Sequence, residues 1–199
     1  VCVCFMILFN LPHIEPKKNE YRVKVISENY FSARKGIEID IGLSLIKNDP
    51  FSLALQKSAE LGVKSVTPLI TERTQVNSNT ISKNKKTRWN SIVRGACEQC
   101  GDNWVPEILD PMDLFSWAEK INSGTKLVLY PGSEKRITEI PISDSIALAV
   151  GPVGDFSEKE IKQLEKVDFI PVSIGERILR AETAVISSLS CLRTMAGEF

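Results

Sequence analysis

At residues 149–160 the chain reads AVGPVGDFSEKE. The first residues of this stretch end a run that is apolar on both faces, which predicts a strand covered by helices on two sides. Gly151 and Gly154 then allow the backbone to turn tightly and to approach a ligand closely. Ser157 and Glu160 have the spacing of a capping box, which predicts the start of a helix. The stretch is therefore a strand–turn–helix unit of an α/β domain.

The same alternation of strands and helices continues on both sides of this unit. It indicates an α/β domain with a largely parallel sheet. The predicted strands are Ile37–Leu45, Val63–Leu69, Thr125–Tyr130, Ser145–Val150 and Asp168–Ser173. The predicted helices lie near residues 50–61, 84–100, 113–122, 157–166 and 181–196.

The first 36 residues have a different pattern. Tyr21–Val25 alternates polar and apolar residues as a half-buried strand does, and Pro12 and Pro16 interrupt the region. We expect a partial β appendage, too short for a complete barrel. The opening apolar run from Val1 has no basic residue before it, so no signal peptide is expected. The chain also lacks an initiator methionine, and we expect that its natural start lies upstream.

The composition excludes some classes of protein and limits others. Of 199 residues, 43% are apolar and 25% charged, which is ordinary for a soluble globular protein. The 25 basic and 25 acidic residues cancel, so a nucleic-acid partner would need a local basic patch. No apolar run approaches the roughly 18 residues that a transmembrane helix needs. Five cysteines do not form a disulfide framework, which favours the cytoplasm.

The most basic stretch lies at the end of a polar segment, residues 71–86, that is rich in Asn, Ser, Thr and Lys. We predict a loop there. Its basic residues together with the next arginine are Lys83, Lys85, Lys86 and Arg88. A solvated surface is the usual interpretation of such a run, and contact with a nucleic acid is the alternative.

Cys97 and Cys100 superficially resemble the CxxC of a redox or zinc site. A zinc site needs a second pair of ligands, and the only histidine is His13, in another region. A thioredoxin-like motif begins its helix, whereas this one ends it. We therefore predict no metal site and interpret both cysteines as packing residues.

A second turn lies at residues 172–184, which read VSIGERILRAETA. A strand ends, and Gly175 leads through a charged turn into an apolar helix. Arg177 and Arg180 oppose the helix dipole at this position, which indicates a role other than helix stability. The first turn has neither the Gly-Lys-Ser/Thr ending of a P-loop nor a complete GxGxxG. From spacing alone, an ordinary strand–helix connection and a cofactor site are equally good interpretations of that turn.

Several stretches together resemble the SPOUT methyltransferases, and among them the ribosomal RNA small subunit methyltransferase E family. The matching pieces agree in order and spacing between about Ile37 and Leu192, and no single piece would suffice. They are QKSAELGV at 56–63, TPL at 67–69 followed by Glu72-Arg73, ACEQCG at 96–101, VPEI at 105–108, and the two turns.

The resemblance implies a deep trefoil knot, a homodimer and S-adenosyl-L-methionine as cofactor. It implies methylation of N3 of a specific uridine in small-subunit (16S) ribosomal RNA, free or in the assembled subunit. It divides the chain into a partial PUA-like segment, residues 1–36, and a SPOUT methyltransferase domain, residues 37–199.

The resemblance also implies roles for individual residues. Arg180 would favour a deprotonated uracil or orient its carbonyls, and Glu182 is the nearest candidate for a proton acceptor. Cofactor contacts are implied for Leu129, Tyr130, Pro131, Gly151, Pro152, Gly154, Ile174, Gly175, Ile178 and Leu179. RNA contacts are implied for Arg73, Lys85, Arg88 and Arg177.

Two departures from the family pattern lie in the first turn, where Val153 replaces a glutamate and Asp155 a glycine. Aspartate adopts positive φ more readily than most residues, so Asp155 can fit. Near Trp104 two family arginines are absent, which weakens phosphate binding. The alternative function is a catalytically impaired or truncated homologue that keeps the knotted dimer as a binding scaffold. A SPOUT enzyme acting on transfer RNA is a third possibility.

Overall fold

The structure, a computed structural model, describes residues 36–74 and 83–199. The expected N-terminal β segment, apart from Gly36, lies outside the described residues, and so does the middle of the expected polar loop, residues 75–82. Gly36 to Phe199 form one compact unit.

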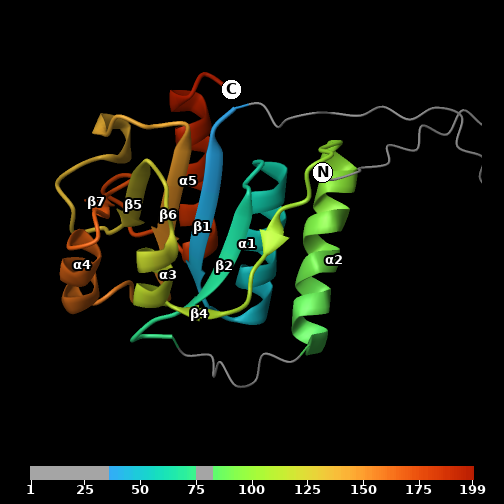
Figure 1. The fold of residues 1–199 in the computed structure, drawn as a ribbon, viewed down its shortest axis with the longest axis horizontal. Coiled ribbons are helices and arrows are strands. Elements are labelled where there is room, and N and C mark those ends of the chain that lie inside the picture. The colour runs from blue at the N-terminus through green and yellow to red at the C-terminus, as the bar shows by residue number, and fades with distance from the viewer. Residues whose placement is uncertain (1–35, 75–82) are drawn as a thin grey trace, which may run out of the picture. The chain divides into compact units, whose positions relative to one another are not determined.

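A seven-stranded, entirely parallel sheet forms the centre of this unit (Figure 1). Its order is β3-β2-β1-β6-β5-β7. The strand β4 also pairs with β2: β3 pairs with the first residues of β2 and β4 with its last residues. The strands are β1 Glu38–Ser44, β2 Ser65–Ile70, β3 Glu107–Ile108, β4 Met112–Asp113, β5 Thr125–Leu129, β6 Ser145–Val150 and β7 Ile170–Val172.

Helices cover both faces of the sheet, as a parallel sheet requires. None of the described helices is long and apolar enough to cross a membrane. They are α1 Asn48–Glu60, α2 Lys83–Cys100, α3 Leu114–Lys120, α4 Glu158–Glu165 and α5 Ala181–Met195, with a 3₁₀ turn, η2, at Ile137–Glu139.

The two faces of β6 enter two separate apolar cores. Ile146, Leu148 and Val150 join the core that includes α1, α2 and α5. The small residues Ala147 and Ala149 join the core that includes α3 and α4. That second core also contains Trp117, Phe156 and Phe169, so the small strand residues there are matched by large aromatic ones.

Gly42 on β1 shows how tightly the second core is packed. A Cβ at this position would lie 2.7 Å from Leu69 Cδ1 and 2.8 Å from the Trp117 ring. The glycine lets the Trp117 ring lie directly on the strand, where it also meets Phe169 with ring centroids 5.5 Å apart.

The five predicted strands and five predicted helices are confirmed, with boundaries shifted by at most two residues. The prediction of a loop through Lys86 is wrong, because α2 begins at Lys83. Lys85 Nζ lies 5.6 Å from the centre of the Trp89 ring, and Lys86 Nζ pairs with Asp110 at 2.5 Å. Both contacts stabilise the first turns of the helix.

The packing interpretation of the CxxC motif holds for one cysteine only. Cys97 is buried among the core residues, whereas Cys100 is exposed, so the interpretation of Cys100 is wrong. Cys100 lies at the last position of α2, where the helix leaves the core. Among the described residues, no three His, Cys, Asp or Glu side chains gather closely enough to hold a metal.

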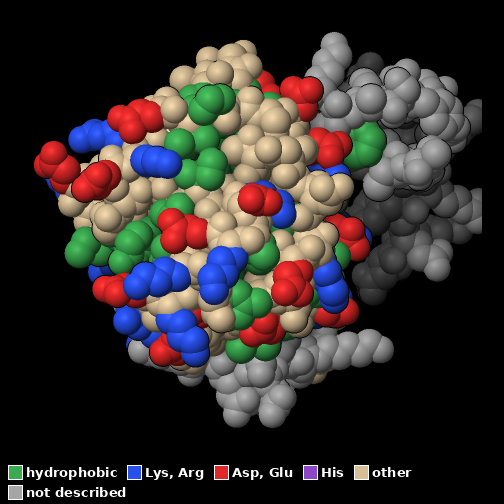
Figure 2. Space-filling view, turned by 60° about the vertical axis from the view of Figure 1, so that its left-hand side comes forward, with side chains coloured by type: hydrophobic (Ala, Val, Ile, Leu, Met, Phe, Trp, Pro, Cys, Tyr) green, Lys and Arg blue, Asp and Glu red, His purple; other side chains and the backbone are tan. Residues whose placement is uncertain are grey.

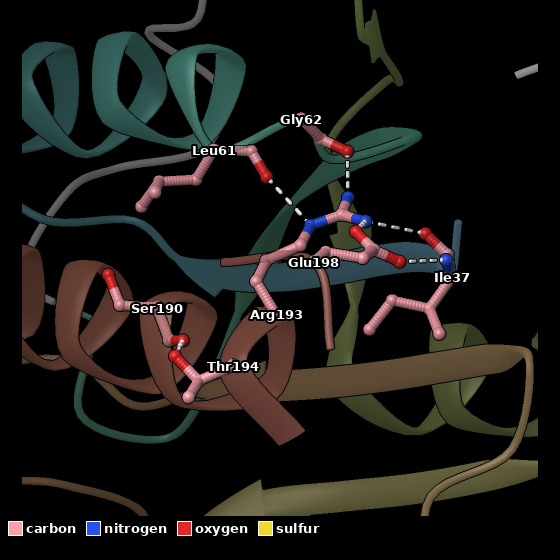
Figure 3. Close-up of polar contacts among 7 residues, drawn as sticks. All are labelled: Ile37, Leu61, Gly62, Ser190, Arg193, Thr194 and Glu198. Atoms are coloured by element: carbon pink, nitrogen blue, oxygen red, sulfur yellow. Dashed lines mark hydrogen bonds and ion pairs between the residues drawn. The ribbon is translucent and has the colours of Figure 1, made fainter. Parts of the chain in front are cut away.

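The amino-terminal end of the sheet is closed by one buried arginine, which we call the Arg193 anchor (Figure 3). Arg193 Nε donates to the Leu61 carbonyl and Nη1 to the Ile37 carbonyl, both at 3.0 Å, and Nη2 donates to the Gly62 carbonyl. Nη1 also pairs with Glu198 Oε2 at 2.5 Å, while Glu198 Oε1 accepts from the Ile37 amide at 2.6 Å. The anchor therefore joins the last residues of the unit to the starts of β1 and β2.

Candidate active site

A cavity of about 800 Å³ lies at the carboxyl ends of β5, β6 and β7, whereas the Arg193 anchor lies at the starts of β1 and β2. Ligands of open α/β sheets bind at this edge, and the volume suits a small molecule. It is lined by residues between Leu129 and Gly132, between Val150 and Asp155, and between Val172 and Ala184, with Ile46, Lys47 and Pro50.

All ten residues predicted to contact a cofactor line this one cavity. They come from three connections, after β5, β6 and β7, that are far apart in sequence. Leu129, Val150 and Val172 form apolar walls where the strands end. Within the described part of the chain, the backbone amides of Ile174 and Leu179 make no hydrogen bond, so these donors are available to a ligand. Apolar walls with a few backbone polar groups suit a nucleoside.

The turn after β6 accommodates its unusual aspartate. Asp155 has φ 64°, as its ability to replace glycine predicts, and its Oδ1 accepts from the Phe156 amide at 2.8 Å. A Cβ on Gly151 would lie 2.7 Å from the same Oδ1, so glycine is needed there. Burial raises the pKa of Asp155, and the nearby Glu160 raises it further. The Phe156 amide and the charge of Arg73 act in the opposite direction.

The predicted capping box at the start of α4 is confirmed. Ser157 Oγ accepts from the Glu160 amide at 3.2 Å, and Glu160 Oε2 accepts from the Ser157 amide at 2.8 Å. Both side chains are buried, at 8% and 4% exposure, so these bonds are shielded from water. The box fixes the end of the cavity-lining turn.

Glu72 and Arg73, which follow β2, bond to the turn after β6 from outside the cavity. We call this pair of residues the outer brace. Glu72 Oε2 accepts from Ser157 Oγ at 2.7 Å, and the Glu72 amide donates to Glu160 Oε1 at 2.8 Å. The Arg73 guanidinium donates to the carbonyl of Gly154. Sequence reasoning noted the Glu72-Arg73 pair only as part of a family match and assigned Arg73 to RNA. A sequence contains no signal that these residues reach a turn about 80 positions away.

The predicted catalytic residues also line the cavity. Arg180 is exposed immediately before α5, and Glu182 is half-buried in its first turn. Neither side chain makes an ion pair or a hydrogen bond with another described residue, so both are available to a substrate. Lys47, which also lines the cavity from the end of the β1 connection, was missed. Its position between a predicted strand and a predicted helix could have indicated it.

The four predicted RNA contacts fall into two groups. Arg177 lines the cavity, and Arg73 bonds to Gly154, which also lines it. Lys85 and Arg88 lie in the first turns of α2, which begins at the same end of the sheet, but they do not line the cavity. Figure 2 shows basic and acidic side chains interspersed over one face of the molecule, in keeping with the balanced net charge.

Comparison with solved structures identifies the fold. A methyltransferase from Legionella pneumophila, solved with the bound cofactor SAM, superimposes with a TM-score of 0.76 at 39% identity. A ribosomal RNA small subunit methyltransferase E from Neisseria gonorrhoeae, bound to S-adenosyl methionine, gives 0.75 at 34% identity. Each match covers 80% of this chain and 66% of the other. The expected SPOUT-type α/β methyltransferase fold is confirmed.

Comparison of sequences identifies the family. The RNA methyltransferase domain family matches residues 33–193. The ribosomal RNA small subunit methyltransferase E of Buchnera aphidicola subsp. Acyrthosiphon pisum is 34% identical over 191 residues, which cover 94% of this chain and 75% of that protein. The chain therefore belongs to the ribosomal RNA small subunit methyltransferase E family of RNA methyltransferases.

Proposed function

We propose that this chain transfers a methyl group from S-adenosyl-L-methionine to N3 of a uridine in small-subunit (16S) ribosomal RNA. One observation carries the proposal: the ten expected cofactor residues share a single cavity with Arg180 and Glu182. A site that binds the methyl donor and a pair of groups able to handle a proton are therefore next to each other.

The cavity fits the donor. The apolar ends of β5, β6 and β7 would enclose the adenine ring, and backbone groups near Ile174 and Leu179 would bond to its edge. Gly175, with φ 142°, has no atom within 4 Å of a Cβ built on it, so its backbone is open to close approach. When bound, S-adenosyl-L-methionine supplies a methyl group already activated on a sulfonium.

The remaining chemistry belongs to the protein. Uridine N3 carries a proton and becomes a good nucleophile only when that proton is removed. The Glu182 carboxylate would accept the proton. The Arg180 guanidinium would stabilise the negative charge that spreads onto the uracil carbonyls. The site then needs chiefly to align N3 with the methyl carbon.

The cationic residues at the cavity suit an anionic substrate. Arg177, Arg180 and Lys47 line it with Asp155 and Glu182, which leaves one net positive charge on the lining side chains. We propose that Arg177 contacts RNA at the site, and that Lys85 and Arg88 contact it farther along α2. The N-terminal residues 1–36 would add a partial PUA-like surface.

The proposal includes the assembly and the path of the chain. We propose a homodimer with the cavity near its interface, a trefoil knot formed by the connections around the cavity, and a cytoplasmic location. Asp155 has φ 64°, a conformation that glycine adopts readily, so the turn keeps a backbone shape open to the family's glycine, which favours an active enzyme over a non-catalytic scaffold.

Two measurements test the function. Calorimetric titration of the protein with S-adenosyl-L-methionine should show binding, and well-folded protein that does not bind would exclude the enzyme. Methyl transfer to unmethylated small subunits and to naked 16S RNA should then be compared for the unsubstituted protein, Arg180→Ala and Glu182→Gln. We expect each substitution to lower kcat by about a hundredfold or more. If both variants keep full activity, the two assigned roles are wrong.

A further inference from the structure

We propose that Glu72 and Arg73, the outer brace, are positioning residues for the cofactor: they hold the turn after β6 in its cofactor-binding shape. This inference rests on the proposed function, because it assigns two more residues to the same site. It gives Arg73 a role different from the RNA contact that the family resemblance implied.

Glu72 acts at the end of the turn where α4 begins. Its carboxylate accepts a hydrogen bond from Ser157 Oγ at 2.7 Å, and its amide donates to Glu160 Oε1 at 2.8 Å. Ser157 and Glu160 are almost fully buried and also bond to each other. Glu72 is thus the third member of a network whose other members fix the last residue of the turn. Such networks hold one geometry because each bond orients the next.

Arg73 acts at the middle of the turn. Its guanidinium donates to the carbonyl of Gly154, and its Cδ lies 3.8 Å from the position of a Cβ on that glycine. Gly154 and Asp155 are consecutive residues with positive φ, at 90° and 64°. Two such residues in sequence are easily rearranged, and an outside bond to the carbonyl between them restrains both.

Arg73 also balances the charge of the turn. Asp155 is half-buried at the cavity, and the positive charge of Arg73 works against the burial that raises the pKa of that carboxyl. Removing Arg73 would therefore loosen the Gly154 carbonyl and make the charged form of Asp155 less favourable. Both effects fall on residues that line the cavity.

The geometry favours a positioning role for the outer brace over two simpler roles, a surface ion pair that only adds stability and an arginine that only binds RNA phosphate. Exposed ion pairs contribute little to stability, but the partners of the outer brace are a buried hydroxyl, a buried carboxylate and a backbone carbonyl. Arg73 uses an Nη1 donor on the Gly154 carbonyl, and an arginine that served only to bind phosphate would not need this bond to the turn. The brace should therefore affect the cofactor more than the RNA.

The test compares Glu72→Ala, Glu72→Gln, Arg73→Ala and Arg73→Lys with the unsubstituted protein. Arg94→Ala is the matched control, because Arg94 is also an exposed arginine but lies on α2 and, unlike Arg73, makes no hydrogen bond to the described residues of the turn after β6. For each protein we would measure the Kd of S-adenosyl-L-methionine by calorimetry, separate KM values for the cofactor and for small-subunit RNA, kcat, and Tm.

We expect Glu72→Ala and Arg73→Ala to raise the Kd and KM of the cofactor about three- to tenfold, as loss of one or two hydrogen bonds predicts. The KM for RNA and kcat at saturating cofactor should change less than twofold. Glu72→Gln should regain most of the affinity, because a carboxamide oxygen still accepts from Ser157. Arg73→Lys should regain part of it, and Arg94→Ala should bind the cofactor normally.

Unchanged cofactor affinity in both alanine variants would overturn the inference, and so would a raised KM confined to RNA. If the unsubstituted protein itself binds no cofactor, the proposed function fails, and that result is recognisable because it does not depend on any variant. Should Glu72→Ala prove unfolded by its Tm, the two Arg73 variants decide the question, since Arg73 is exposed.

Discussion

The two ends of the parallel sheet are built in opposite ways. At the amino-terminal end, the Arg193 anchor buries one guanidinium, 5% exposed, and bonds it to three carbonyls and a carboxylate. At the carboxyl-terminal end, turns with positive φ surround a cavity, and Val153 and Ile178 are exposed at 66% and 87%. Stability is thus concentrated at one end of the sheet and adaptable binding groups at the other.

The largest expected effect is a loss of stability after a substitution in the Arg193 anchor, at the amino-terminal end of the sheet. Arg193→Ala removes a cation from a buried pair and leaves Glu198 and three carbonyls without that partner. We expect the free energy of unfolding to fall by about 3 kcal/mol, because three carbonyls and the partly buried Glu198 carboxylate all lose the same donor. Denaturant unfolding would measure it. Cofactor affinity of the folded fraction should stay the same, and a large loss of affinity at unchanged stability would contradict the division between the two ends.

A smaller effect is expected from Ser157→Ala, at the start of α4. The substitution removes a helix cap and the bond to Glu72, so we expect a loss of about 1 kcal/mol in the free energy of unfolding. Unlike the change at Arg193, it should also weaken cofactor binding. Thr194→Ala is the control, because Thr194 is exposed near the anchor and its hydroxyl bonds only to the Ser190 carbonyl (Figure 3). Equal effects of the two changes on cofactor affinity would refute the comparison.

The smallest effect concerns pH and the turn after β6. Burial raises the pKa of Asp155 above its ordinary 3.8, so folding favours the protonated form. Its contribution to stability is fully present below pH 3.8 and is lost as the pH rises through the raised pKa. Asp155→Asn has no charge to bury and tolerates positive φ. At neutral pH it should be more stable than the unsubstituted protein by less than about 1 kcal/mol, after allowance for solvent screening.

That difference should shrink as the pH is lowered, because the native aspartate then becomes neutral as well. Unfolding curves between pH 3 and pH 8 would show the convergence. Asp168→Asn is the matched control, since Asp168 also has positive φ, 69°, but is exposed. A stabilisation of Asp155→Asn that is the same at every pH would mean that charge burial is not its cause.

The order of five strands and five helices along the chain could be predicted from the sequence because each of these segments shows its own apolar pattern. The strands β3 and β4 escaped prediction because each has only two residues, too few for any pattern. Lys83–Lys86 looked like a loop because polarity alone does not distinguish a solvated helix turn from a coil.

For the site, the sequence revealed the residues that a ligand would meet but not those that hold them. Gly151, Gly154 and Gly175 mark turns after strands, and turns at the carboxyl end of a parallel sheet converge on one place. Glu72 and Arg73 reach the first of these turns only through the pairing of β2 with β1 and of β1 with β6. Contacts of that kind depend on sheet order, which no local pattern encodes.

The bond between Glu198 and the Ile37 amide, 2.6 Å long, brings the two ends of the folded unit together. A short linker between residues 199 and 36 would therefore close the unit into a ring without disturbing the strands. An open chain can lose a knot only through one of its ends, whereas a closed ring has no end and keeps its topology even in denaturant. Circularisation would thus make the proposed trefoil knot permanent. The unfolded ring would then differ in electrophoretic mobility from an unknotted ring of equal length.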